Sequence, residues 1–111
     1  MPKQTRLSGP DKLPDESEAS LLSKVTKAAH LYGWATYHTR RSDRSEKGWP
    51  DLVLCRPPRI LFVELKTNLS QVSPDQLFWL HALQDCNLVT RVWRPQDWDM
   101  IVQVLETGKA G

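Results

Sequence analysis

The distribution of apolar and polar positions predicts a helix near the start of the chain. From Asp15 onward, apolar side chains recur every three or four positions and form one stripe of Leu21, Leu22, Val25, Ala28, Ala29 and Tyr32. The expected first turn holds Asp15, Glu16 and Glu18, where the helix dipole favours negative charge. Gly33 follows the last apolar position, so we expect the helix to end there. Residues 1–14 are polar and contain several prolines, which predicts a flexible tail.

Three short segments, 34–39, 51–55 and 60–66, are predicted to form strands because they are rich in apolar, aromatic or β-branched residues. The second and third are separated only by Arg56-Pro57-Pro58-Arg59. Because proline cannot donate a hydrogen bond to a central ladder, we expect this tetrapeptide to form the turn of a hairpin. All three strands can then pair as an antiparallel meander.

A second helix is predicted from three concordant signals at its start. Ser73 suits the N-cap, Pro74 suits the first helical position, and Gln76 completes a capping box. A strand over 88–93 and a helix over about 97–105 follow, and Gly108 ends that helix. Its expected apolar face consists of Trp98, Ile101, Val102 and Leu105. The strands on either side of the second helix should be parallel, so the fold class is α/β, with a mixed central sheet flanked by helices in one domain over 15–108.

Composition and charge limit the classes of function. The chain has 111 residues, of which 40% are hydrophobic and 25% charged, which fits one folded domain and excludes a largely disordered protein. A net charge of +2 permits a polyanionic partner. No apolar run suits a membrane helix or a signal peptide, so we expect a cytoplasmic protein. Cys55 and Cys86 lack metal-ligand spacing, and we expect two reduced, packed thiols.

The predicted hairpin brings charged residues together at one end of the sheet. Glu64 and Lys66 lie two positions apart, so their side chains leave the same face of one strand. With the turn centred on Pro57-Pro58, Asp51 lies opposite Glu64 at a Cβ separation of about 4.5–5.5 Å. Two opposed carboxylates are unfavourable unless a cation lies between them, and oxygen ligands suit a divalent metal ion. The sequence therefore predicts a metal site with Lys66 beside it.

Each of these residues also has a simpler structural interpretation. Glu64 and Lys66 form a kind of pair that is common on strand surfaces, although the buried character of their strand argues for a metal or other partner. Glu18 begins the apolar stripe of the first helix, so we expect it to point towards the sheet and to join the acidic cluster. The alternative for Glu18 is a favourable interaction with the helix dipole. Glu16 lies off the stripe and is expected in solvent.

The segments around these residues resemble the PD-(D/E)xK nuclease core. Gly48-Trp49-Pro50-Asp51 is followed by Glu64-Leu65-Lys66, then by Ser73-Pro74-Asp75-Gln76-Leu77-Phe78-Trp79-Leu80 and Val92-Trp93-Arg94-Pro95-Gln96-Asp97-Trp98. Together they resemble the virus-type replication-repair nuclease (VRR-NUC) family in its small standalone, phage-like form. The similarity extends from about Glu18 to Leu105. It implies a restriction-endonuclease-like αβββαβ core, which agrees with the order of elements above.

The resemblance implies roles for individual residues. The ligands for Mg²⁺ or Mn²⁺ would be Asp51, Glu64, the Leu65 backbone carbonyl and, directly or through water, Glu18. Lys66 would orient the attacking water or stabilise the charge on the phosphorane. Gln76 would support the site, a role that competes with its capping-box interpretation unless both hold at once. A metal ion neutralises a phosphodiester and lowers the pKa of bound water, and the sequence leaves one-metal and two-metal mechanisms open.

A polar loop leads from the first predicted strand towards Asp51. Its positions 40–47 carry four basic and two acidic residues. We expect the basic side chains to clamp DNA phosphates, against the alternative of an ordinary solvated loop. His38 is either a site residue or structural. The predicted DNA-binding residues are His38, Arg40, Arg41, Ser42, Arg44 and Lys47.

Two main functions compete for this chain. The leading hypothesis is a metal-dependent endonuclease that hydrolyses phosphodiester bonds in DNA, with flaps or four-way junctions as expected substrates. The alternative is a small basic DNA-binding or interaction protein without catalysis, against which the intact acidic and lysine positions argue. A purely structural role, with the tail as a docking arm, is a third hypothesis. No nucleotide cofactor is expected.

The apolar aromatic residues bear on oligomeric state. We expect Trp79, Trp93 and Trp98 in the core or at a dimer interface rather than stacked on DNA bases. An edge strand and these side chains predict a homodimer, which would place two sites about a two-fold axis.

Overall fold

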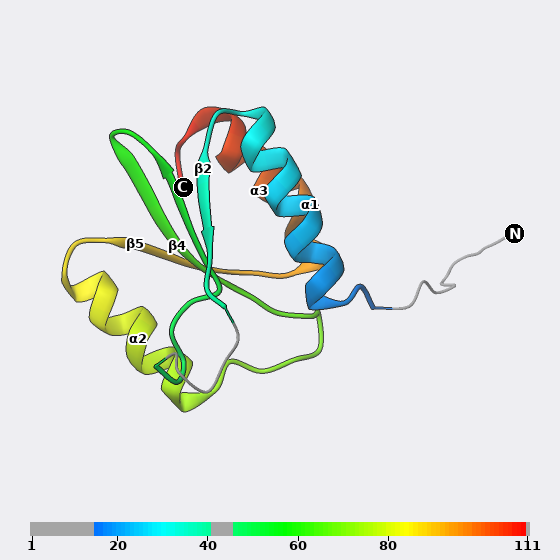
Figure 1. Cartoon of the computed structure of the whole chain (residues 1–111). Helices are drawn as coiled ribbons and strands as arrows, with labels where there is room; N and C mark the ends of the chain where they lie inside the picture. Colours follow the sequence, from blue (N-terminus) through cyan, green and yellow to red (C-terminus); the bar gives the residue numbers. More distant parts are fainter. Residues whose placement is uncertain (1–14, 41–45, 111) are drawn as a thin grey trace, which may run out of the picture.

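The computed structural model describes residues 15–40 and 46–110. The elements are helix α1 (Glu18–Leu31), strands β2 (Ala35–His38), β3 (Leu52–Arg56) and β4 (Arg59–Leu65), helix α2 (Pro74–Asp85), strand β5 (Val89–Trp93), the 3₁₀ turn η1 (Pro95–Asp97) and helix α3 (Trp98–Thr107). This order confirms the predicted α/β class (Figure 1). The predicted tail over 1–14 lies outside the described residues. Within the described ranges, no helix is long and apolar enough to cross a membrane.

The four strands form one mixed sheet in the order β2-β3-β4-β5. β2, β3 and β4 pair antiparallel, and β5 joins β4 in parallel after the crossover through α2. The hairpin turns at Pro57-Pro58, which are joined by a cis peptide bond. Arg56 pairs with Arg59 and Leu52 pairs with Val63, which confirms the predicted register.

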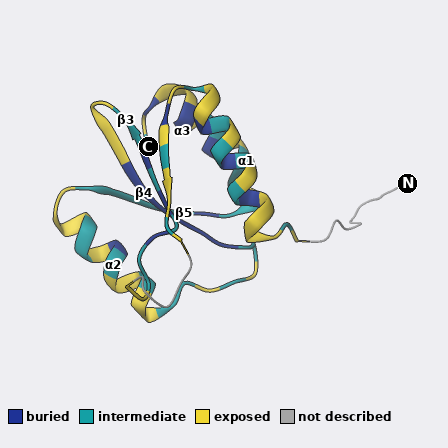
Figure 2. Ribbon diagram, viewed as in Figure 1, coloured by how far each residue is buried: buried dark blue, intermediate teal, exposed yellow. Residues whose placement is uncertain are grey.

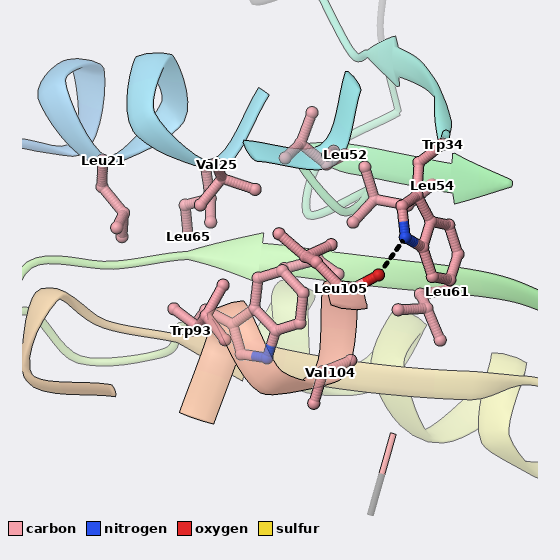
Figure 3. Close-up of a cluster of buried hydrophobic side chains, with 13 residues drawn as sticks. Leu21, Val25, Trp34, Leu52, Leu54, Leu61, Leu65, Trp93, Val104 and Leu105 are labelled. Carbon is pink, nitrogen blue, oxygen red and sulfur yellow. Dashed lines mark hydrogen bonds between the residues drawn. The ribbon is translucent and has the colours of Figure 1, made fainter. Parts of the chain in front are cut away.

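The hydrophobic core lies between the sheet and the helices α1 and α3, which cover the same face, while α2 lies on the other side (Figure 1). Buried residues follow the inner sides of α1, α3 and the central strands (Figure 2). Side chains from α1 and α3 meet those of β3 and β4, and the indole Nε1 of Trp34 donates to the Leu105 carbonyl oxygen at 2.8 Å (Figure 3). The Arg56 Nη1 donates to the carbonyl oxygens of Tyr32 at 2.9 Å and Leu105 at 3.1 Å. This core fixes the strand ends that carry the site.

Helix boundaries confirm most of the sequence signals and correct one. Ser73 caps α2 with a complete capping box, and α1 ends before Gly33, which has φ +85°. However, α1 begins at Glu18 rather than Asp15, because the Ser17 side chain accepts a hydrogen bond from the Ser20 N–H and serves as N-cap.

The last helix begins within one residue of its predicted start. Pro95–Asp97 form a 3₁₀ turn in which Asp97 Oδ2 accepts from the Arg94 N–H at 2.9 Å, so α3 starts at Trp98. Its buried residues are Ile101, Val104 and Leu105, while Val102 is only partly buried.

One prediction about packing is wrong in part. Both cysteines are free thiols, but Cys86 is exposed at the end of α2 and only Cys55 is partly buried. Among the tryptophans expected in the core or at an interface, Trp93 is fully buried, Trp98 is partly buried and packs against the core, and Trp79 is partly exposed.

Candidate active site

Two carboxylates face each other where the β3–β4 hairpin ends. The register that pairs Leu52 with Val63 places Asp51, which directly precedes β3, opposite Glu64. The main-chain N–H of Leu65 donates to Asp51 Oδ2 at 2.8 Å, so β4 holds this carboxylate in place. Glu64 is only 2% exposed. Because side chains alternate along a strand, Asp51 and Glu64 lie on the face opposite to the core residues Leu52 and Val63.

Lys66 and Gln76 both contact the same oxygen of Glu64. Lys66 Nζ lies 3.7 Å from Glu64 Oε2, and the lysine is itself buried. Gln76 Nε2 donates to Glu64 Oε2 at 2.7 Å. The amide oxygen of the same side chain, Gln76 Oε1, accepts from the Ser73 N–H at 2.8 Å. Gln76 therefore completes the α2 capping box and donates to Glu64 at once, so the two contacts do not exclude each other.

The Glu64 carboxyl carries an unusual electrostatic load. Burial, and after it the negative charge of Asp51, raise the pKa of Glu64 from 4.5 to about 8, against the opposing effect of Lys66. Glu18 adds a smaller increase to this pKa. Glu64 Oε1 is buried and has no hydrogen-bond partner among the described residues. A cation would stabilise this buried Glu64 oxygen, because the oxygen has no described partner and lies beside a second carboxylate.

The first helix contributes differently from what its apolar stripe predicts. Glu18 is exposed, which corrects the expectation that it points away from solvent, but its negative charge still raises the pKa of Glu64, so it lies near the carboxylate pair. Glu18 is exposed because α1 begins at this residue, one turn before the buried stripe starts at Leu21. Glu16 is not simply solvated either, since its carboxylate accepts from the Ser20 hydroxyl at 2.7 Å and pairs with Lys24 at 3.2 Å.

The donor set fits a hard divalent cation with few protein ligands. Within residues 15–40 and 46–110, no group of three or more His, Cys, Asp or Glu side chains could hold a metal ion. Asp51 and Glu64 form a two-carboxylate set, which is the set that Mg²⁺ commonly uses together with water and substrate phosphate.

The comparison with protein families supplies an independent observation. The sequence model of the VRR-NUC domain matches residues 4–97 of the 111. The chain belongs to the VRR-NUC family. Membership implies a nuclease-type function on DNA, and the matched range includes the whole carboxylate–lysine cluster and α2. A search of curated proteins and a search of solved structures found no match.

Aromatic side chains hold the segment before Asp51 against α2. The sequence analysis did not predict this cluster. The Trp49 ring packs edge-to-face on Trp79, with centroids 5.0 Å apart, and on Phe62 at 6.0 Å. The Trp79 Nε1 donates to the Lys47 carbonyl oxygen at 3.1 Å. Because Gln76 also lies on α2, this helix supports both carboxylates of the site. The tryptophans were visible in the sequence, but their mutual contact depends on the crossover.

Gly48 allows this segment to approach α2 closely. It has φ +88°, and a Cβ built on it would lie 2.5 Å from the Asp75 main chain. We expect Gly48→Ala to lower the free energy of unfolding by at least the strain of about 1–3 kcal/mol for a left-handed residue, plus the clash. Denaturant unfolding measures this loss. Gly33→Ala is the matched control, since Gly33 has φ +85° but its nearest contact would be 3.9 Å away. Equal losses for both variants would contradict the close-approach argument.

The double role of Gln76 can be separated by substitution. Gln76→Glu keeps the acceptor that the capping box requires but replaces the donor to Glu64 with a negative charge. We expect stability close to wild type and DNA cleavage lowered by about 10–100-fold. Gln76→Ala should lose both stability and activity. Thermal unfolding and initial cleavage rates report the two effects, and wild-type cleavage by Gln76→Glu would contradict the supporting role.

The predicted DNA-binding residues are only partly described. His38, at the end of β2, and Arg40 are exposed. Lys47 is exposed, and its Nζ lies 3.5 Å from Asp75 Oδ2. The remaining three, Arg41, Ser42 and Arg44, lie outside the described residues.

Proposed function

We propose that this VRR-NUC protein is a Mg²⁺- or Mn²⁺-dependent endonuclease that hydrolyses phosphodiester bonds in structured DNA such as flaps or four-way junctions. The observation that carries the proposal is the buried Glu64, which faces Asp51, contacts Lys66 and retains an oxygen without a partner among the described residues. A bound divalent ion would neutralise phosphate charge and lower the pKa of water.

The surrounding residues have distinct tasks in this proposal. Asp51, Glu64 and the Leu65 carbonyl hold the ion. Lys66 places a compact positive charge where negative charge develops on the phosphate. Gln76 keeps Glu64 oriented through its 2.7 Å hydrogen bond. Glu18 is exposed at the rim and acts through water, consistent with its weak effect on the pKa of Glu64.

The segment before Asp51 would contact the DNA backbone. In this proposal its phosphate contacts come from His38, Arg40, Arg41, Ser42, Arg44 and Lys47. Each phosphate contact that a cationic side chain makes adds to the dependence of affinity on salt. Replacing Lys47 with methionine should therefore weaken binding to all DNA shapes about equally and reduce the salt slope by about one.

The decisive experiment is a cleavage assay on linear, flap and four-way DNA with Mn²⁺, with Mg²⁺ and with EDTA. We expect cleavage only with metal, and none by Asp51→Asn. Calorimetric titration of Mn²⁺ into the metal-free protein should show binding that Asp51→Asn loses. DNA binding without any cleavage or metal uptake would instead support a non-catalytic binding protein.

The sheet face opposite the core carries α2 over only part of its area, and the uncovered part supports a homodimer. Register places Ala35, Cys55 and Ile60 in one row and Tyr37 with Val53 in the next. Tyr37 is 61% exposed and Ile60 37% exposed. This apolar face adjoins the carboxylate pair, so a second copy packed on it would bring two sites together for a symmetric junction. Light scattering should give a dimer that Tyr37→Glu dissociates, whereas a monomeric wild-type protein would remove this part of the proposal.

A further inference from the structure

The side chain of Arg94 connects the end of β5 to the loop that follows Lys66. Its Nη1 donates to the carbonyl oxygens of Thr67 at 2.6 Å and Ser70 at 2.7 Å. These two oxygens lie at either end of a tight turn, in which the Thr67 hydroxyl accepts from the Ser70 N–H at 2.9 Å. A single guanidinium nitrogen therefore closes the turn from outside.

Arg94 is itself held in a fixed position. Its main-chain N–H donates to Asp97 Oδ2 at 2.9 Å. The preceding residue, Trp93, is fully buried, and its carbonyl oxygen accepts from the Lys66 N–H at 3.0 Å. Trp93, the last residue of β5, thus holds Lys66 through its main chain, and Arg94, the next residue, holds Thr67 and Ser70 through its side chain.

The loop links two groups that contact Glu64. Lys66 stands at one end, and Ser73 at the other end caps the helix that carries Gln76. Both Lys66 Nζ and Gln76 Nε2 reach the same Glu64 oxygen. Because Arg94 fixes the middle of this loop, it restricts how far either group can move relative to Glu64.

We propose that Arg94 is a positioning residue of the nuclease site, which holds Lys66 and Gln76 against Glu64; this role rests on the proposed function. It acts through the loop and does not bind the scissile phosphate. Loss of its hydrogen bonds should lower kcat by about 10–100-fold, the range typical of residues that orient a metal site, with KM within about twofold of wild type.

The test compares Arg94→Met, which keeps the aliphatic stem but has no donor, with Arg94→Lys, which restores one. The matched control is Arg91→Met, since Arg91 lies three residues earlier, on β5, and also donates to main-chain oxygens, at Thr90 (2.7 Å) and Ala110 (3.1 Å). We expect reduced kcat for Arg94→Met, partial recovery for Arg94→Lys, and wild-type kcat for Arg91→Met. Amide exchange at Ser70 and Gln76 in the metal-free protein should accelerate in Arg94→Met, accelerate less in Arg94→Lys, and stay at the wild-type rate in Arg91→Met.

Several outcomes would overturn the positioning role. A raised KM with unchanged kcat would make Arg94 a phosphate contact, and wild-type exchange at Ser70 in Arg94→Met would remove the restraint itself. Should Arg94→Met not fold, Arg94→Lys decides, because a change in kcat without a change in exchange contradicts the proposal. Failure of the wild-type protein to cleave DNA refutes the nuclease function, whereas the exchange measurement still tests the restraint.

Discussion

Replacing Lys66 with methionine should lower kcat for DNA cleavage by about 10²–10³-fold, the size of effect seen when one donor to a developing oxyanion is removed. Lys66 is buried and its Nζ lies 3.7 Å from Glu64 Oε2, so the ammonium group is held beside the carboxylate pair. Methionine has a similar shape without the charge, so the loss would report the positive charge rather than packing.

The measurement must separate this effect from weaker metal binding. Lys66 lowers the pKa of Glu64, so its removal would favour the protonated carboxyl and reduce metal affinity. Cleavage rates at saturating Mn²⁺, with unfolding followed by circular dichroism, keep the two effects apart. Lys109→Met serves as the control, because Lys109 is exposed after α3. A folded Lys66→Met protein that cleaves within a few-fold of wild type would refute the catalytic role of Lys66.

Glu64→Gln should abolish cleavage and yet stabilise the metal-free protein at alkaline pH. The pKa of Glu64 is about 8 in the folded protein and near 4.5 when the chain is unfolded. The folded state thus prefers the protonated carboxyl. This preference for the protonated Glu64 carboxyl adds to the free energy of unfolding. The contribution is fully present below pH 4.5 and is lost as the pH rises through about 8. Glutamine resembles the protonated acid in shape and cannot ionise, so its contribution does not change with pH.

Denaturant unfolding at several pH values, without metal, checks this expectation. Wild-type stability should fall between pH 4.5 and 8 relative to Glu64→Gln, by an amount on the order of a few kcal/mol. Mn²⁺ should replace the proton, so its affinity for the wild type should rise over the same pH range. Glu106→Gln, which changes an exposed carboxyl on α3, provides the control. Parallel pH profiles for wild type and Glu64→Gln would contradict the raised pKa.

Local sequence signals were sufficient for much of this protein. The two prolines at 57 and 58 leave one place for the hairpin turn, and the turn determines that Asp51 meets Glu64. The spacing of Glu64 and Lys66 places them on one face, because side chains alternate along a strand. Ser73 and Gln76 define the start of α2 through a capping box that involves only neighbouring residues. These features depend on contacts within a few positions, or on pairing next to a tight turn.

The same local signals could not predict contacts between segments that are distant in the sequence. The apolar stripe of α1 indicates which side is buried, but the exposure of Glu18 depends on where the helix meets the sheet end. The docking of Trp49 on Trp79 depends on the position of α2 after the crossover. Arg94 was visible within a family-like segment, but its hydrogen bonds to the Thr67 and Ser70 carbonyl oxygens were not.

The sequence by itself therefore determined the order of elements, the hairpin register and the pairing of Asp51 with Glu64, since local sterics and backbone hydrogen bonding dictate them. Only the tertiary structure decided how deeply Glu64 is buried, which groups contact it and what holds them there. Burial and the resulting pKa of Glu64 depend on packing between α2, β4 and β5, whose positions no local pattern specifies.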